Sequence, residues 1–144
     1  MRRTEFITKG LDPQTLTVGE LMQDAVFTCG PSTDVLSICR RMTQHNFGSL
    51  PVVDEQQLLV GIVTEYDVLQ AVIEGRDLRK VLARDLMSPQ VLTVTENMSL
   101  VEVATLFQDR YVTRVPVVRD KKLVGILARR DLLFGHMKAS QYWS

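Results

Sequence analysis

The sequence predicts an α/β protein of the α+β type, built from two tandem β-α-β-β-α units that pack sheet to sheet with pseudo-two-fold symmetry. Three observations predict this fold class. The chain contains an internal repeat, both copies place strand-length and helix-length apolar patterns in the same order, and 144 residues leave room for two units. A unit of about 60 residues buries too little surface to be stable alone, so we expect the two units to cover each other's strands.

The first half of the first copy predicts a helical turn, a short strand and a helix. Thr17-Val18-Gly19-Glu20 has the spacing of a capping box and starts the turn, and Val26-Phe27-Thr28 is the strand. The helix begins after a capping residue within 32–34 and ends between 46 and 48. Its apolar face has helical spacing and consists of Val35, Ile38, Cys39 and Met42. On that face, Cys39 is expected to be a buried free thiol.

The second half of the copy predicts a hairpin and another helix. A strand at 50–53, a polar loop at 54–57 and a returning strand at 58–63 form the hairpin. The returning strand is continuously apolar, so we expect it to be buried on both faces. The helix begins at Thr64, and Gly75 is placed as its C-terminal stop.

A second copy repeats these elements. Leu86-Met87 repeats Leu21-Met22 at a distance of 65 positions (from 21 to 86), and this distance holds as far as the Pro-Val-Val strand. The second hairpin loop is one residue shorter, so the distance falls to 64 positions (from 61 to 125) for the remaining elements. The matching pairs include Val26 and Val91, Thr28 and Thr93, Val35 and Leu100, Pro51 and Pro116, Gly61 and Gly125, and Asp67 and Asp131. Agreement at every element indicates a tandem duplication.

The repeat sets the expected domain boundaries. We expect a leader at 1–16, a first unit at 17–75, a linker at 76–82, a second unit at 83–137 and a tail at 138–144. The linker is charged and carries no core pattern, which is typical of a loosely attached connection.

Composition excludes several classes of protein. Lys+Arg and Asp+Glu both number 17, so the formal net charge is zero and no overall field attracts nucleic acid or an anionic membrane. There is no apolar run long enough to cross a bilayer and no secretory signal at the N-terminus, so we expect a cytoplasmic protein without a membrane partner. The two cysteines fit neither a disulfide framework nor a metal site. Without a nucleophile beside a base, a metal-ligand cluster or a Walker-type loop, we expect no enzyme and no catalytic residues.

The main candidate for chemistry is the segment Gly61–Asp67, where an apolar strand ends at a polar turn that begins a helix. Backbone N–H groups at such a helix start can hold a phosphate. Thr64 and Asp67 also have the spacing of a helix cap, which needs no ligand. In the copy, Gly125–Asp131, Ala128 cannot cap although the aspartate is still present. From the residues alone, both interpretations stay open.

These residues resemble a known family. A duplicated unit with Leu-Met, an amphipathic helix, an apolar residue before Pro-Val-Val-Asp, a hairpin, and then Gly, two apolar residues and Thr-x-x-Asp is similar to a pair of cystathionine-β-synthase (CBS) domains. The resemblance covers residues 17–137. It implies that clefts between the two units bind an adenosyl small molecule such as AMP, ADP, ATP or S-adenosylmethionine as a regulatory ligand, with no cofactor required. It also implies a homodimer.

The resemblance further implies two sets of ligand-binding residues, each drawn from both units, and no metal ligand. The first predicted set is Ile62, Thr64, Tyr66, Asp67, Val91, Leu92, Val112, Thr113, Arg114 and Pro116. The second predicted set is Val26, Phe27, Phe47, Gly48, Ser49, Pro51, Ile126, Ala128, Arg130 and Asp131.

The chemistry of both sets suits an adenosine phosphate. A carboxylate such as Asp67 accepts both vicinal ribose hydroxyls, while Thr64 and helix-start N–H groups hold phosphate oxygens. Arg114 is expected either to reach the phosphate or to form an ordinary surface ion pair. The second set departs from the pattern at Ala128, which loses one hydroxyl contact. The two arginines after Ala128 offset this loss if they point inward.

We therefore expect a regulatory module that senses its ligand by a conformational change and acts on an unidentified effector protein. The alternative is a structural dimeric scaffold with degenerate clefts. A third interpretation, nucleic-acid binding, depends on basic residues of the second half, and the zero net charge argues against it. Those residues are Arg110, Arg114, Arg119, Lys121, Lys122, Arg129 and Arg130. We expect His45 and His136 near helix ends, and Tyr142-Trp143 either exposed or against a partner.

Overall fold

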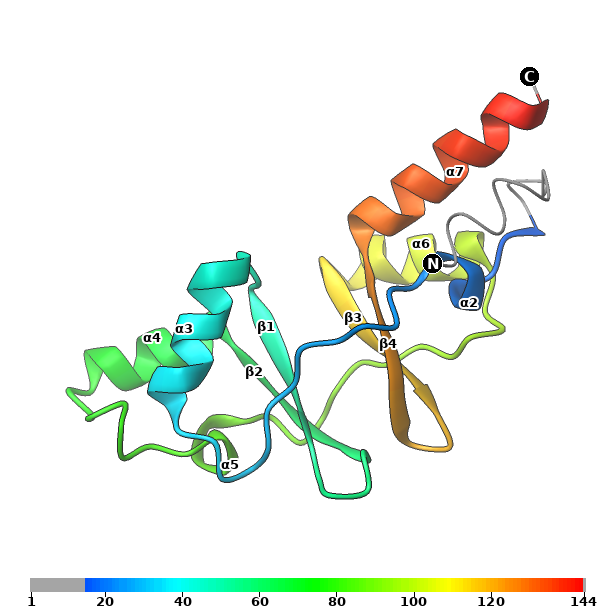
Figure 1. Ribbon diagram of the computed structural model, residues 1–144. Helices are drawn as coiled ribbons and strands as arrows, with labels where there is room; N and C mark the ends of the chain where they lie inside the picture. The colour runs from blue at the N-terminus through cyan, green and yellow to red at the C-terminus, as the bar shows by residue number, and fades with distance from the viewer. Residues whose placement is uncertain (1–14, 144) are drawn as a thin grey trace. The chain divides into compact units, whose positions relative to one another are not determined.

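The computed structural model of the protein describes residues 15–143, which form two compact units (Figure 1). The continuous unit is Phe27–Val91. The split unit combines the segment that ends at Val26 with the segment that begins at Leu92. Each unit contains one two-stranded antiparallel hairpin together with helices, which confirms the predicted α/β class.

The continuous unit places three helices around its hairpin. β1 (Ser49–Val53) pairs with β2 (Leu59–Thr64), and α3 (Val35–His45), α4 (Glu65–Ile73) and α5 (Ala83–Leu86) complete the unit. Apolar residues of the hairpin and of these helices meet in one core, because each element turns an apolar side inward. The buried members are Cys29, Val35, Ile38, Met42, Leu50, Val52, Val63, Val68, Val81 and Ala83.

The split unit repeats this arrangement with the second half of the chain. β3 (Arg114–Arg119) pairs with β4 (Lys122–Ala128), and the helices are α2 (Val18–Leu21), α6 (Leu100–Arg110) and α7 (Arg129–Trp143). Its core draws on both segments of the unit. The buried members are Leu16, Val18, Leu21, Met22, Val94, Leu100, Val103, Phe107, Val115, Val117, Leu127, Leu132 and Ala139.

The short helices are exchanged between the two sequence repeats. Gln23, which lies just after α2, forms a two-bond backbone bridge with Ile126 of β4, at N···O distances of 2.9 and 2.8 Å. Ser88, which lies just after α5, forms the same bridge with Ile62 of β2, at 2.9 and 3.0 Å. Strands β2 and β4 therefore each take a one-residue pairing partner from the other repeat, while β1 and β3 take theirs, Cys29 and Val94, from their own repeat. The compact units and the predicted repeat boundaries divide the chain differently, and those boundaries stay a prediction.

The exchanged helices explain why a Leu-Met pair and a strand glycine recur together in both repeats. A Cβ atom on Gly61 of β2 would lie 2.7 Å from Sδ of Met87, and one on Gly125 of β4 would lie 2.6 Å from Sδ of Met22. Only glycine lets the methionine and the backbone after it approach the strand this closely.

Most helix ends lie where the sequence predicts them. Thr17 and Glu20 form the capping box of α2, with Thr17 N donating to Glu20 Oε1 at 3.2 Å. Asp34 caps α3, whose C-cap is Asn46 in the left-handed conformation. Gly75 comes after α4 with a φ of 72°, a conformation that glycine adopts at little cost. These predictions are confirmed. Helix ends are predictable from sequence because a cap depends on neighbouring residues alone.

Two strand predictions are wrong. Residues 26–28 form no strand, and single-residue bridges at Gln23 and Cys29 lie on either side of them instead. The chain passes from the split unit to the continuous unit within this segment, so each flank pairs with a different hairpin. β2 is not buried on both faces, since only Gly61 and Val63 are buried and the rest of the strand is half-buried.

Three further positions differ from expectation. Cys39 is half-buried, and Cys29 is the buried cysteine. His136 lies inside α7 rather than near a helix end, because α7 continues to Trp143 through residues that the sequence assigned to a tail. Of the predicted leader, residues 1–14 lie outside the described residues, whereas Leu16 is fully buried in the split-unit core.

Candidate functional site

The first turn, Thr64–Asp67, joins β2 to α4 in the continuous unit and forms a complete capping box. Thr64 N and Thr64 Oγ1 both donate to Asp67 Oδ2, at 2.8 and 2.9 Å. Asp67 N donates to Thr64 Oγ1 at 3.3 Å. The bonds to the carboxylate use one oxygen, and Oδ1 of Asp67 accepts no hydrogen bond from the described part of the chain. The cap and a ligand contact are therefore compatible on the same aspartate.

The backbone around the first turn leaves a donor as well as an acceptor. Glu65 N donates to Gly48 O at 3.0 Å, but Tyr66 N has no partner within residues 15–143. An unpaired N–H in the first turn of a helix favours an anion, and the helix dipole adds to this preference. The Tyr66 side chain is 85% exposed. Among the described residues, the turn thus has one carboxylate oxygen and one backbone N–H group without a hydrogen-bond partner.

The second turn, Ala128–Asp131, joins β4 to α7 in the split unit and treats its aspartate differently. Ala128 N donates to Asp131 Oδ2 at 2.8 Å, which preserves half of the capping box. Gln23 Nε2 donates to Asp131 Oδ1 at 3.2 Å. Asp131 is 1% exposed, and no other charged side chain of the described chain is buried. Arg129 and Arg130 replace Glu65 and Tyr66 of the first turn, and both are exposed.

A hollow of about 340 Å³ adjoins the second turn. It lies within the split unit and is lined by Gln23, Ala128, Arg130, Asp131 and Phe134. Three of its lining residues belong to the second predicted set, namely Ala128, Arg130 and Asp131. Gln23 and Phe134 were missed by sequence reasoning, because neither belongs to a motif and Gln23 comes from the other repeat.

Each predicted set is divided between the two units. Within the continuous unit lie Ile62, Thr64, Tyr66, Asp67 and Val91 of the first set and Phe27, Phe47, Gly48, Ser49 and Pro51 of the second set. Within the split unit lie Leu92, Val112, Thr113, Arg114 and Pro116 of the first set and Val26, Ile126, Ala128, Arg130 and Asp131 of the second set.

In both units the loop before the hairpin contacts the turn after it. Gly48 O accepts from Glu65 N in the continuous unit, and Thr113 O accepts from Arg129 N at 3.0 Å in the split unit. The hairpin registers also correspond, because Ser49 pairs with Thr64 and Arg114 pairs with Ala128. Residues assigned to opposite sets therefore lie side by side within each unit.

Arg114 lies beside the second turn within its own unit and is half-buried. Burial lowers the pKa of its guanidinium from the ordinary value. The basic residues of the β3–β4 hairpin do not form one stripe, because Arg119, Lys121 and Lys122 lie at its tip and Arg114 lies at the opposite end. Arg119 is paired with Glu96, at 2.6 Å between Nη2 and Oε1.

Three aromatic rings gather in the continuous unit near the end of α3. The ring centroids of Phe27 and His45 are 4.2 Å apart, and Phe47 lies 5.5 Å from His45. The guanidinium of Arg41 lies 5.6 Å from the Phe27 centroid. Sequence reasoning assigned Phe27 and Phe47 to the second set but missed His45, whose position before the C-cap of α3 was the available signal.

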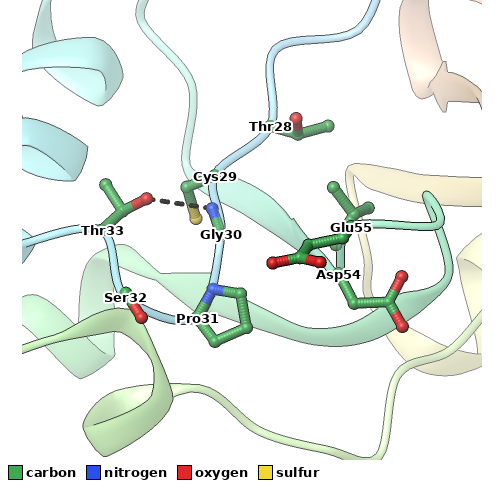
Figure 2. A pocket seen from close by; sticks show the side chains of 9 residues that line it. Thr28, Cys29, Gly30, Pro31, Ser32, Thr33, Asp54 and Glu55 are labelled. Atoms are coloured by element: carbon green, nitrogen blue, oxygen red, sulfur yellow. Dashed lines mark hydrogen bonds between the residues drawn. The ribbon is translucent and has the colours of Figure 1, made fainter.

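A second hollow, of about 590 Å³, lies over the segment before α3 and the tip of the β1–β2 hairpin (Figure 2). Its lining residues are Thr28, Cys29, Gly30, Pro31, Ser32, Thr33, Val53, Asp54 and Glu55. Gly30 N donates to Thr33 Oγ1 at 2.9 Å and fixes the loop, as the dashed line in Figure 2 shows. Burial raises the pKa of the Cys29 thiol to about 11, against a smaller opposing effect of Arg41. The thiol is therefore protonated at neutral pH, which disfavours nucleophilic attack.

Residues 15–143 contain no group of three or more His, Cys, Asp and Glu side chains placed to hold a metal ion. None of the helices in that range combines the length and apolar character needed to cross a bilayer.

Comparison with known proteins gives the family. A family model for the CBS domain matches residues 18–74 and again residues 83–136, which together make up most of the chain. The chain belongs to the CBS domain family. An uncharacterized protein of Methanopyrus kandleri is 37% identical over 122 residues; the match covers 83% of this chain and 62% of the relative. This CBS chain thus spans less than two thirds of that relative's length.

Solved structures of CBS domain pairs have the same fold. The structure of CBSX2 in complex with AMP is 30% identical, with a TM-score of 0.76, and the match covers 87% of this chain and 98% of that one. The CBS domain pair of protein MJ0100, in complex with 5′-methylthioadenosine and S-adenosyl-L-methionine, is 28% identical with a TM-score of 0.73. That match covers 85% of this chain and 98% of the other.

Proposed function

We propose that this CBS domain protein is a regulatory module that binds an adenosine-containing ligand at the Thr64–Asp67 turn. One observation carries the proposal: Oδ1 of Asp67 is left free by a capping box that uses only Oδ2. A free carboxylate oxygen at a helix start is suited to a ribose hydroxyl, and the nearby Tyr66 N–H is suited to an anionic group. The AMP bound by CBSX2 and the adenosyl ligands bound by the MJ0100 domain pair support the same class of ligand.

The two predicted sets have distinct roles in this proposal. Asp67 accepts the ribose hydroxyls and Thr64 stabilises the turn. The second set supplies a weaker site, because Ala128 lacks the hydroxyl of Thr64 and both oxygens of Asp131 already accept hydrogen bonds. The protein itself performs no chemistry on the ligand. Its output is a change in conformation that an effector protein detects.

We further propose that the chain forms a homodimer through exposed apolar residues of α4 and α7. On α4, Leu69 is 56% and Ile73 is 77% exposed, and the corresponding residues of α7, Leu133 and Met137, are 73% and 48% exposed. Residues spaced by four share one helix face, so each helix presents an apolar stripe. A water-exposed stripe at matching positions of both repeats favours burial against a second copy.

Dimerisation is tested by sedimentation velocity on the wild type and on Ile73→Glu. The charged side chain should convert a dimer to a monomer, because a buried unpaired carboxylate is costly. Val101→Glu is the matched control, since Val101 is 57% exposed but lies on α6. A wild-type monomer, or a dimer that Ile73→Glu leaves intact, would contradict this interface.

Ligand binding is tested by isothermal titration calorimetry and thermal shift with AMP, ADP, ATP, 5′-methylthioadenosine and S-adenosylmethionine. A ligand at about 100 times its Kd should stabilise the protein by about 2.7 kcal/mol, which raises Tm by several degrees. Asp67→Ala should remove most of the binding, and Asp131→Ala should have a smaller effect. On the ligand side, 2′-deoxy-AMP should bind about tenfold or more weakly than AMP, because a hydrogen bond to a charged group contributes about 1.5–3 kcal/mol.

The alternative function, a structural scaffold, predicts a dimer that binds no adenosyl ligand. If no adenosyl compound binds, or if Asp67→Ala binds as the wild type does, ligand sensing through this turn is excluded. Persistence of the dimer under those conditions would then favour the scaffold, for which the apolar stripes of α4 and α7 are the relevant observation.

A further inference from the structure

The Gln23 side chain occupies a defined place on the second turn. Its backbone is fixed beside β4 by the two-bond bridge to Ile126, two residues before Ala128. From there Nε2 reaches Oδ1 of Asp131 at 3.2 Å. A carboxylate only accepts hydrogen bonds, so the amide nitrogen must be the atom that faces it. Gln23 is exposed although Asp131 is buried, so the amide can leave without disturbing the core.

The continuous unit provides an internal control for this contact. Ser88 forms the same backbone bridge with Ile62 of β2 that Gln23 forms with Ile126 of β4. The Ser88 hydroxyl, however, donates to Gln90 O at 3.3 Å rather than to the aspartate of the first turn. The same backbone position thus holds a long amide in one unit and a short hydroxyl in the other, and only the amide covers a carboxylate oxygen.

We propose that Gln23 is a built-in competitor of the ligand: its amide takes the place on Asp131 that the vicinal hydroxyls of a ribose would take, and so keeps the second turn at low affinity. This inference rests on the proposed function and adds a residue that decides which turn is open. The amide N–H donates to Oδ1 of Asp131, and a ribose hydroxyl would donate to the same oxygen. The hollow of about 340 Å³ beside the contact is lined by both Gln23 and Asp131, so movement of the amide opens space where the hydroxyls would lie.

A reciprocal pair of variants tests this inference, with AMP as the probe in isothermal titration calorimetry. Gln23→Ser gives the second turn the residue of the first, and Ser88→Gln does the reverse. Gln23→Ser should strengthen the weaker AMP binding event about tenfold, and Ser88→Gln should weaken the stronger event about tenfold, because each change removes or adds one competing charge-assisted hydrogen bond. Gln23→Ser combined with Asp131→Asn should lose the gain. Thermal unfolding without ligand checks that all variants fold.

The outcomes separate this inference from the proposed function. If Gln23→Ser changes neither affinity by more than about twofold while Asp67→Ala still removes the stronger event, the ligand site stands and the competitor role of Gln23 is overturned. If AMP binds to neither the wild type nor Gln23→Ser, both proposals fall for this nucleotide. A gain in Gln23→Ser that persists in the Asp131→Asn double variant would also overturn the inference, because the amide would then be acting somewhere other than on Asp131.

Discussion

The Thr64–Asp67 and Ala128–Asp131 turns share one backbone plan and complete it in opposite ways. In both, the N–H of the residue before the helix donates to the aspartate three positions later, at 2.8 Å. In the first turn a threonine hydroxyl adds to the cap, and within residues 15–143 the other carboxylate oxygen accepts no hydrogen bond. In the second turn an alanine replaces the threonine, and Gln23 takes the other oxygen. Duplication has therefore preserved the hydrogen-bonded frame while changing which groups remain available.

The charges around the two turns differ as well. The first turn carries Glu65 next to its aspartate, whereas the second carries Arg129 and Arg130 and has Arg114 paired beside it in the hairpin. The arginines around the second turn favour anionic groups, whereas a buried aspartate alone does not. The second turn therefore combines surrounding positive charge with an aspartate whose two oxygens already accept hydrogen bonds. Under the proposed function, side chains outside the repeated frame would set the affinity of each turn.

The largest expected effect comes from disturbing the close contact between each strand glycine and the methionine that follows the exchanged helix. A Cβ on Gly61 would meet Sδ of Met87 at 2.7 Å and Ser88 O at 3.0 Å, and one on Gly125 would meet Sδ of Met22 at 2.6 Å and Gln23 O at 2.9 Å. Gly61→Ala and Gly125→Ala should each lower the free energy of unfolding by about 3 kcal/mol, measured by urea denaturation, because overpacking against backbone cannot be relieved by a side-chain rotation.

Gly48→Ala is the matched control for these two variants. Its Cβ would lie 2.9 Å from Oε1 of Glu65, the end of a flexible exposed side chain that can move away. We expect a change within about 0.5 kcal/mol. If Gly61→Ala or Gly125→Ala behaved like Gly48→Ala, the exchanged helices would not be packed on the hairpins as closely as the distances indicate.

The second largest effect is a difference in protein stability between variants of the two aspartates, measured without ligand. Asp131→Ala removes a buried carboxylate and leaves Ala128 N and Gln23 Nε2 without their acceptor, which should cost about 2–3 kcal/mol. Asp67→Ala loses only a half-buried cap contact and should cost about 1 kcal/mol. Urea denaturation without ligand measures both. Equal costs would show that burial of Asp131 has no energetic consequence, which would contradict the difference between the two turns.

These two pairs of variants mark what local sequence could and could not predict. Helix ends at Thr64, Asn46 and Gly75 were predictable, since a cap is formed by residues a few positions apart. The bond between Gln23 and Asp131 joins residues 108 positions apart, and no local pattern encodes it. Detecting it would require knowing that α2 packs against the hairpin of the other repeat. The missing strand at 26–28 has the same cause, because its apolar pattern is local but its pairing partners belong to two units.

A third, smaller effect comes from exchanging the capping residues. Thr64→Ala removes the hydroxyl that accepts from Asp67 N and should lower the free energy of unfolding by about 1 kcal/mol. Ala128→Thr places a hydroxyl at the matching position of α7 and should raise it by up to about 1 kcal/mol, because the second half of the capping box becomes available. Both are measured by urea denaturation. A loss of stability in Ala128→Thr would mean that the split unit has no space for the hydroxyl beside Asp131.

The smallest effect near neutral pH concerns Cys29, whose place in the split unit is taken by Val94. Cys29 pairs with Val52 in the same parallel manner as Val94 with Val117. Burial raises the thiol pKa from 9.0 to about 11, so folding favours the protonated form. This contribution is fully present below pH 9 and is lost as pH rises towards 11, since the unfolded chain releases the proton first.

Replacing the thiol by the residue of the other unit isolates this contribution. Cys29→Val should lose less stability than the wild type between pH 9 and 11, while the two proteins should show parallel curves below pH 9, as measured by urea denaturation across that range. Other groups that titrate in this range are common to both proteins, so the difference between the curves reports the thiol alone. If the free energy of unfolding fell equally in both proteins between pH 9 and 11, the folded continuous unit would accommodate the thiolate without cost. Ionisation of Cys29 would then make no difference to stability relative to valine.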